Sequence, residues 1–140
     1  MQSGKIRDNQ LTASSHAKHF EAFKARLHGQ SCWRSVQNDT GEFLEINFSS
    51  QKTYVNGIST QGDPQADNWT QQYYVAYYWG SVWKNLTQAY IEDVKIFQGN
   101  WDRTSTIIHP LEQRFYATAV RIYPLKWHGN IALRLELYSC

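Results

Sequence analysis

The sequence predicts an all-β fold, a sandwich or barrel of short antiparallel strands. Aromatic residues make up 15% of the 140 residues, with 6 Trp and 9 Tyr, and this composition favours strands over a helical bundle. Short runs of β-branched and aromatic residues are separated by turns rich in Gly, Asn and Asp, which is typical of such folds. Only residues 18–27 carry a partly helical pattern. There is no internal repeat or linker, so residues 1–140 are predicted to form one domain.

Alternation of apolar and polar residues locates the strands in the first part of the chain. Leu44, Ile46 and Phe48 recur at every second position and therefore share one face of a strand. The next strand patterns lie at residues 54–59 and 73–79. Residues 54–59 are predicted to be the second strand, and residues 73–79 are rich in β-forming types.

The following strands are delimited by a turn and by a proline. Gly80-Ser81 predicts a turn that leads into a strand at residues 82–83. Residues 119–123 predict another strand, which we expect to end at Pro124 because proline cannot donate a hydrogen bond to a ladder.

The last strand pattern is the clearest in the chain. Every second residue is apolar, so one face is expected to lie in the core and the other to be polar or exposed. The core face comprises Ile131, Leu133, Leu135 and Leu137, and the other face comprises Ala132, Arg134, Glu136 and Tyr138. Arg134, like Arg121 in the preceding strand, is predicted to be an ion-pair or hydrogen-bond anchor rather than a ligand contact.

Composition and charge exclude several classes of partner. The formal net charge is only +2 and charged residues make up 19% of the chain, so no nucleic-acid partner is predicted. No apolar run approaches the roughly 20 residues that a membrane-spanning helix needs. Residues 1–4 lack the basic and apolar regions of a signal peptide. The chain is therefore expected to be either intracellular or a module of a larger protein.

Four Asn-x-Ser/Thr sequons bear on that choice. They begin at Asn38, Asn47, Asn68 and Asn85. Roughly one would arise by chance in a chain with this many Asn, Ser and Thr residues, so four favour a secreted protein. Chance in an Asn-rich chain remains the alternative explanation.

Ordered motifs extend over nearly the whole chain and together resemble one known family. The opening is Gly-x-Ile-x-Asp-x-Gln-Leu-Thr-Ala-Ser-Ser at residues 4–15. The later motifs are Ala-Arg-Leu at 25–27, Trp33, Phe-Leu-Glu-Ile-Asn-Phe at 43–48, Thr-Gln-Gly at 60–62, Asn-Trp-Thr-x-x-Tyr at 68–73, Phe-x-Gly-Asn-x-Asp at 97–102, Arg-Ile-Tyr-Pro-x-x-Trp-His-Gly at 121–129 and Leu-Arg-Leu-Glu-Leu-Tyr-x-Cys at 133–140. In this order they resemble discoidin domains, the C-type modules of coagulation factors V and VIII.

The resemblance implies both a fold and a role. It implies a jelly-roll-like β-sandwich or barrel of about eight antiparallel strands, with ligand-binding loops, called spikes, at one end. It also implies an extracellular, non-enzymatic recognition or cell-adhesion module within a larger protein.

The two cysteines depart from the pattern of that family. Members usually pair the final cysteine with one that precedes the Gly-x-Ile motif, and this sequence has no cysteine there. Cys140 is therefore expected to lack its usual partner. Cys32 is expected in a loop at the other end, which argues against a Cys32–Cys140 bond. We expect Cys32 to be a free thiol, with an intermolecular disulfide as the alternative.

By resemblance, the spikes are residues 16–24, 34–41 and 62–68, and their composition indicates the ligand class. Hydroxyl groups of a sugar are held by Asp, Asn, Gln and Arg side chains beside an aromatic face, and such residues are frequent here. The predicted ligand-binding residues are His16, His19, Phe20, Arg34, Asn38, Asp39, Asp63, Gln65, Asp67 and Trp69. The predicted partner is a cell-surface glycan or glycoprotein, bound in a lectin-like manner. Ordinary solvated loop residues, with Trp69 in the core, are the alternative.

Peripheral binding to a phospholipid membrane is a second hypothesis. Family members that dock on phosphatidylserine place bare apolar side chains beside basic residues on the spikes. Phe20 and Phe23 beside Lys18 and Lys24 fit this pattern in part. The acidic third spike, residues 62–68, does not fit, because an anionic leaflet would repel it. A protein ligand is the remaining hypothesis.

Metal binding and catalysis have little support in the sequence. Asp8 and Asp102 are candidate oxygen donors for calcium, but no calcium-loop spacing is present. No metal or cofactor is therefore assigned. Nucleophile elbows, zinc motifs and phosphate-binding loops are absent, and adjacent Glu92-Asp93 would point to opposite faces of a strand. His109, before Pro110, is expected in a loop, and His128 is expected to be structural.

Overall fold

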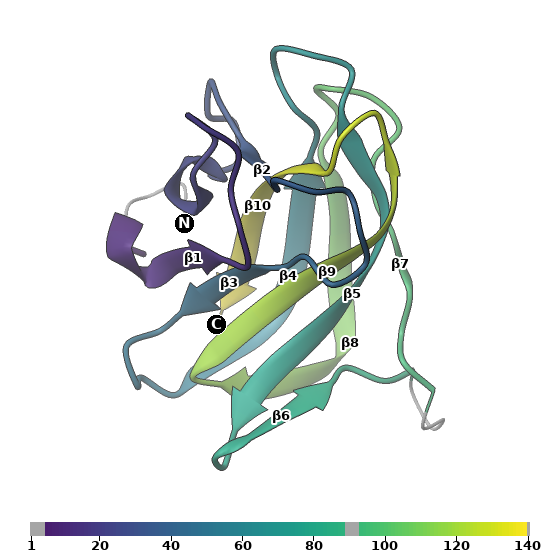
Figure 1. The fold of residues 1–140 in the computed structure, drawn as a ribbon. Helices are drawn as coiled ribbons and strands as arrows, with labels where there is room; N and C mark the ends of the chain where they lie inside the picture. Colours follow the sequence, from purple (N-terminus) through teal and green to yellow (C-terminus); the bar gives the residue numbers. More distant parts are fainter. Residues whose placement is uncertain (1–4, 89–92, 140) are drawn as a thin grey trace.

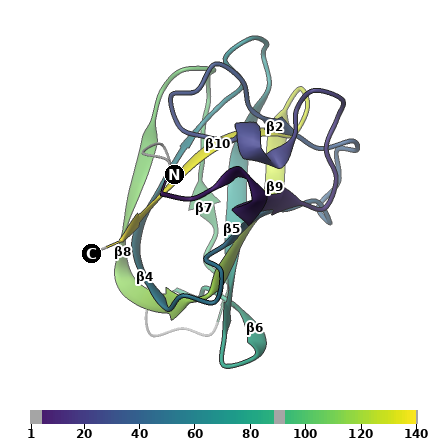
Figure 2. The same ribbon diagram turned by 90° about the vertical axis from the view of Figure 1, so that its left-hand side faces the viewer.

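Two antiparallel sheets packed face to face form the molecule, and this confirms the predicted β-sandwich. The computed structural model describes residues 5–88 and 93–139. Figure 1 and the perpendicular view in Figure 2 show the two layers. Within the described residues there are ten strands and two short 3-10 helices, η1 (Asp8–Gln10) and η2 (Ala22–Lys24).

The larger sheet has six strands. Its order is β1-β3-β9-β5-β6, and β7 pairs with β5 beside β6. The strands are β1 (Leu11–Ala13), β3 (Leu44–Asn47), β5 (Trp69–Trp79), β6 (Val82–Asn85), β7 (Phe97–Gln98) and β9 (Ala119–His128). β5 and β9 form the long central pair, with Val75 opposite Ile122.

The smaller sheet has four strands in the order β2-β10-β4-β8. They are β2 (Trp33–Arg34), β4 (Thr53–Gln61), β8 (Ile107–Ala117) and β10 (Ala132–Ser139). His109 lies in β8 opposite Ile58, so the prediction of a loop there was wrong. The following Pro110 is tolerated because β8 is an edge strand and its register with β4 shifts near Gly57.

The core lies between the sheets and is built from the predicted alternating faces. Leu44 and Ile46 of β3 are fully buried, as are Leu133 and Leu135 of β10. Aromatic rings fill the centre, where Tyr73 stacks on Phe97 with ring centroids 5.1 Å apart. This inward packing of apolar side chains is the main stabilising contribution to the fold.

Strand β9 continues through Pro124 to His128, so the prediction that it ends at the proline was wrong. Strand β3 pairs with β9 only as far as Ile122. Beyond that point β9 has β5 as its ladder partner, and the register of that ladder shifts beside Gln72. A proline is accommodated at such an irregularity because its missing N–H leaves no regular ladder bond unmade.

The outer face of β10 is polar but mostly buried, whereas the pattern predicted a polar or exposed face. Arg134 is 4% exposed and Glu136 is 9% exposed. The segment that follows η2 pairs with the edge of β10, because Leu27 N–H donates to Leu135 O and Leu135 N–H donates to Ala25 O. On the outer face, Arg134 is enclosed by the connections whose carbonyls it binds. Of the helical pattern at residues 18–27, only the single turn of η2 forms.

The loops divide between two ends of the sandwich. At the upper end in Figure 1 lie the β4–β5 connection, the β7–β8 connection and the β9–β10 turn, and we call this the spike end. The β5–β6 hairpin lies at the lower end, which we call the hairpin end. No helix among the described residues is long and apolar enough to cross a membrane.

Candidate functional site

A buried ion pair joins the second and third spikes. Arg34 at the end of β2 donates from Nε to Oδ2 of Asp63 at 2.8 Å and makes a second, shorter contact from Nη2. Asp63 is fully buried, while the side chain of Arg34 is 19% exposed. Both are predicted ligand-binding residues. The carboxylate of Asp63 lies below the surface, and the outer part of the guanidinium of Arg34 reaches solvent.

Asp63 is held in its charged form by its surroundings. Burial alone would raise its pKa, but hydrogen bonds from the Gln65 backbone, the Asn68 amide and Arg34 outweigh burial and lower the pKa below its ordinary value. The backbone nitrogen of Gln65 lies 2.9 Å from Oδ1 of Asp63, and the amide nitrogen of Asn68 lies 3.1 Å from Oδ2. A charged, fully buried carboxylate with these partners anchors a loop.

A chain of asparagine amides continues from this pair across the spike end. The side-chain carbonyl oxygen of Asn68, Oδ1, accepts from the backbone N–H of Asn130 at 2.8 Å. The side-chain amide of Asn38 donates to Oδ1 of Asn130 at 3.0 Å, and its own carbonyl accepts from Ile131 N–H at 2.8 Å. The β4–β5 connection, the β9–β10 turn and the second spike are thus linked by side-chain hydrogen bonds.

The first spike lies over the same ion pair. The ring of Phe20 covers the guanidinium of Arg34, with 3.8 Å between the ring centroid and Cζ. Phe20 is half-buried as a result, whereas the neighbouring His19 and the more distant His16 are exposed. Lys24 Nζ donates to His19 O at 2.7 Å, which fixes the left-handed turn at His19, whose φ is 73°.

The remaining predicted residues differ in how they present their side chains. Gln65, Asp67 and Asp39 are exposed. The Gln65 amide donates to Gln30 O at 3.0 Å, and Asp39 accepts from Gly41 N–H. Trp69 is half-buried and stacks on His128 with ring centroids 4.4 Å apart, so its ring faces a partner within the fold.

The sequence pattern did not single out several residues that the structure places at the spike end. Trp101 is 66% exposed in the β7–β8 connection. Arg103 in the same loop pairs with Asp67 at 2.7 Å. Val36, within the second spike, is 64% exposed. Trp101 occupies the x position between Asn and Asp of the Phe-x-Gly-Asn-x-Asp motif, and that position lies in a loop. The motif therefore contained the signal for Trp101.

Arg134 ties the loops of the spike end to the sheet beneath them. Its guanidinium donates to three backbone carbonyls, those of Gly62 at 2.8 Å, Gly29 at 2.8 Å and Arg103 at 2.7 Å. These carbonyls belong to three different connections. The prediction that Arg134 is a hydrogen-bond anchor is confirmed, and so is that for Arg121, which pairs with Glu45 at 2.7 Å.

Cys32 is a buried free thiol, in agreement with the expectation for it. Burial and the nearby carboxylate of Asp63 raise its pKa to about 12. The thiolate is therefore hardly populated near neutral pH, and the thiol is chemically quiet. The predicted lack of a partner for Cys140 concerns a residue outside the described part of the chain.

The candidate calcium donors have other partners. Asp8 pairs with Arg26 at 2.7 Å, and Asp102 accepts from the backbone of Thr104 and Ser105 and from the Ser105 hydroxyl. In the described ranges, 5–88 and 93–139, no three His, Cys, Asp or Glu side chains converge as metal ligands. Glu92 of the Glu92-Asp93 pair lies outside those ranges.

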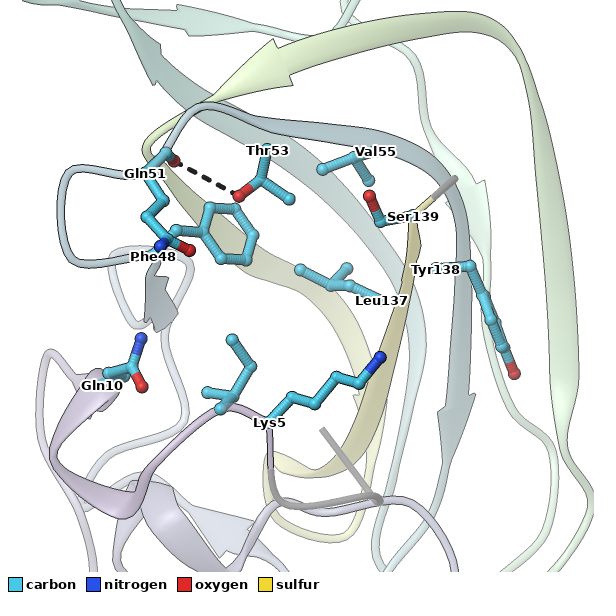
Figure 3. A pocket seen from close by; sticks show the side chains of 10 residues that line it. Lys5, Gln10, Phe48, Gln51, Thr53, Val55, Leu137, Tyr138 and Ser139 are labelled. Carbon is cyan, nitrogen blue, oxygen red and sulfur yellow. Dashed lines mark hydrogen bonds between the residues drawn. The ribbon is translucent and has the colours of Figure 1, made fainter.

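A pocket of about 220 Å³ opens between the sheets, away from the spike end. Figure 3 shows Phe48, Val55 and Leu137 on its walls, with Lys5 and Ser139 at its border. Its lining is mainly apolar and includes residues from both described ends of the chain. It offers no group of ionisable side chains on which chemistry would depend.

Comparisons with known proteins agree with this architecture. The family model described as F5/8 type C domain matches residues 10–137. Human retinoschisin is 33% identical over 152 residues, which is 99% of this chain and 66% of retinoschisin. The chain thus spans slightly less than two thirds of that relative.

Solved structures share the fold. Recombinant discoidin II of Dictyostelium discoideum matches with a TM-score of 0.82 at 25% identity, over 92% of this chain and 54% of that chain. The family 32 carbohydrate-binding module of Clostridium perfringens NanJ, solved with galactose, matches with a TM-score of 0.66 at 13% identity, over 94% of this chain and 97% of that chain.

Proposed function

The chain belongs to the F5/8 type C domain family, the discoidin domains, and from this premise we propose that it is an extracellular, non-enzymatic adhesion module. In this proposal the spike end binds a carbohydrate in a lectin-like manner, and the partner is a cell-surface glycan or glycoprotein. The sequons at the exposed Asn47 and Asn85 support the extracellular location. The family 32 module solved with galactose supports the ligand class, because it has the same fold.

The rigid frame of the spike end is the observation that carries the proposal. Arg34, Asp63 and Asn68 connect two spikes through buried hydrogen bonds, and Asn38 and Asn130 extend the connection to the β9–β10 turn. Sugars bind weakly for their size, so a site gains affinity when its polar groups are already fixed.

The groups that remain accessible on this frame suit a saccharide. The exposed edge of Arg34 lies between the half-buried ring of Phe20 and the loop that carries the exposed side chain of Gln65. His16, His19, Asp39 and Asp67 add exposed polar side chains on the three spikes. A sugar presents hydroxyl groups to such donors and acceptors and presents C–H groups to an aromatic ring.

The chemistry of the ion pair favours binding over catalysis. A general acid or base must be within reach of a substrate and exchange its proton near the working pH. Asp63 is fully buried, engaged by three donors and held at a lowered pKa. It therefore serves the frame of the site and lies out of reach of a substrate.

A broad glycan array that includes galactose-terminated glycans tests the proposal. We expect the protein to bind a subset of glycans above background, and Gln65→Ala and Asp67→Ala each to weaken that binding about five- to tenfold, since a lost hydrogen bond to a ligand costs about 1 kcal/mol. Gln51→Ala is the matched control, because Gln51 is exposed in the β3–β4 connection. An empty array with folded protein would count decisively against a lectin-like role.

Peripheral membrane binding remains the second candidate because two exposed apolar side chains, Val36 and Trp101, lie in the second spike and the β7–β8 connection. Phe20, the tip favoured by the sequence pattern, is partly occupied by Arg34. Co-sedimentation with phosphatidylserine vesicles, compared with phosphatidylcholine vesicles, separates the candidates. Binding to the anionic vesicles that Trp101→Ser removes, together with an empty array, would replace the lectin proposal by this one.

A further inference from the structure

The outer face of the six-stranded sheet carries an aromatic cluster that extends to β6 at the hairpin end. Arg121 of β9 lies between the rings of Phe43 and Trp83, with Cζ 4.2 Å from each centroid. Tyr78 packs against Trp83 with 5.3 Å between ring centroids. Tyr78, Trp83 and Ala119 are among the residues that line an open hollow of about 400 Å³ on this face.

Asn85 stands on the same face as Trp83, two residues further along β6. Register places Trp83 opposite Tyr78 and Asn85 opposite Ala76, so both side chains point outward with the cluster. Residues i and i+2 of a strand are about 7 Å apart, a distance that a sugar linked to the asparagine amide spans. Asn85 is exposed and opens the sequon Asn85-Leu86-Thr87.

The four sequons differ in whether the fold leaves room for a glycan. Asn68 is 6% exposed and its amide nitrogen donates to Asp63, so a sugar there would break the frame of the spike end. The amide nitrogen of Asn38 donates to Asn130. Asn47 is exposed, but Glu45, not an aromatic residue, stands two positions before it. Asn85 combines an exposed amide with a neighbouring ring.

We propose that Asn85 is an N-glycosylation site whose first N-acetylglucosamine packs on Trp83. The C–H face of a pyranose ring stacks on an aromatic ring, and Arg121 and Tyr78 hold the indole in place. Tethering makes this weak contact intramolecular, so it forms at a high effective concentration. The inference rests on the extracellular location in the proposed function and is independent of the ligand.

The location gives such a glycan a physical role. β6 is an edge strand of its sheet, and Val82 in it is 52% exposed. Exposed edge strands with apolar side chains pair with other chains unless they are covered. A glycan at Asn85 would cover this edge at the hairpin end and leave the spike end open.

Secretion of the full chain behind a cleavable signal peptide from cultured animal cells tests the modification, with glycopeptide mass spectrometry as the readout. We expect Asn85 to be occupied in most secreted molecules and Thr87→Ala to remove this glycan alone. Secreted, folded protein with unmodified Asn85 would overturn the proposal. The same preparations are applied to the glycan array. Loss of the glycan at Asn85 is expected to leave the binding profile unchanged. Failure of this inference and failure of the lectin proposal therefore give different results.

Packing on Trp83 is tested by combining two substitutions. In the glycosylated protein, Thr87→Ala is expected to lower Tm by roughly 2–4 °C, and in the Trp83→Leu background the same substitution is expected to have a much smaller effect. Protein made in bacteria, which carries no glycan, corrects for any effect of Thr87→Ala itself. Equal shifts in the two backgrounds would show that the sugar does not rest on the ring.

Discussion

The ten predicted ligand-binding residues divide, in the structure, into side chains that build the spike end and side chains that face outward. Asp63 is fully buried, and Asn38 uses both ends of its amide within the protein. Gln65 and Asp67, two and four positions beyond Asp63, are exposed. Residue type alone cannot separate these groups, because a carboxylate or amide that binds sugar also satisfies a loop.

Acid sensitivity distinguishes the buried carboxylate from its exposed neighbour. The pKa of Asp63 is lowered in the folded state relative to the unfolded value of about 3.9. The folded state therefore binds fewer protons, and the stability from Asp63 is full above about pH 5 and lost as the pH falls through the folded pKa. At pH 7, Asp63→Asn is expected to cost about 3–5 kcal/mol, because Arg34 loses its buried partner.

Urea unfolding of both proteins at pH 7 and near pH 3 measures this effect. The gap between wild type and Asp63→Asn should shrink on acidification, since near pH 3 the unfolded wild-type chain binds a proton at this carboxyl more readily than the folded protein does. Asp67→Asn, an exposed change in the same loop, should show little gap at either pH. A gap for Asp63→Asn that stays constant with pH would contradict the assignment.

At the scale of elements, strand existence was predictable and strand ends were not. The alternation in residues 43–48 and 131–137 located β3 and β10, because a face of apolar side chains needs only local spacing. The extension of β9 past Pro124 depends on where its neighbours stop, and β3 pairs only as far as Ile122. Where the neighbouring strands end is decided by the tertiary structure, so local sequence does not predict how far β9 extends.

The buried outer face of β10 has the same cause. Its polar residues matched an exposed face in the pattern, yet Arg134 and Glu136 are almost fully buried. Arg134 is buried because three backbone carbonyls from separate connections converge on it. The family motifs contained Arg134, but its partners are carbonyls, which carry no sequence signal.

Two turns with glycine in the left-handed region offer a matched comparison. Gly129 in the β9–β10 turn has φ 71° and Gly80 in the β5–β6 hairpin has φ 62°. A Cβ at Gly129 would lie 2.5 Å from Asp67 O and also clash with Asn68, whereas a Cβ at Gly80 meets nothing within 4 Å. Replacing either glycine by alanine is strained by the left-handed backbone conformation. The change at Gly129 also places a Cβ in collision with the frame of the spike end.

Gly80→Ala is expected to cost about 1–2 kcal/mol, and Gly129→Ala about 3–4 kcal/mol. Urea unfolding midpoints measure both costs. Gly129→Ala should also weaken glycan binding, because Asn68 must shift, while Gly80→Ala should leave binding unchanged. Equal costs for the two turns would mean that the spike end yields easily and is not a rigid frame.

At the scale of the whole molecule, the two ends of the sandwich have separate tasks. The spike end is cross-linked by side-chain hydrogen bonds that connect loops distant in sequence, such as Arg34 to Asp63 and Asn38 to Asn130. The outer sheet face toward the hairpin end is aromatic and carries Asn85. The sheets between them form a rigid spacer, so a change at one end is expected to act independently of the other.

Arg134 is the residue on which the spike end as a unit depends, and Arg134→Lys tests this dependence. Its planar guanidinium reaches the carbonyls of Gly29, Gly62 and Arg103 simultaneously, a geometry that a single ammonium cannot reproduce. We expect a loss of about 2–4 kcal/mol in unfolding free energy, because buried carbonyls lose charged donors.

Amide hydrogen exchange in the β4–β5 and β7–β8 connections should accelerate well beyond that in β5 and β9, since the loops are released while the core persists. Arg114→Lys in β8, where the side chain is exposed, is the control and should change neither quantity. Uniform acceleration over loops and core would instead indicate that Arg134 supports the sandwich as a whole and has no special role in arranging its binding end.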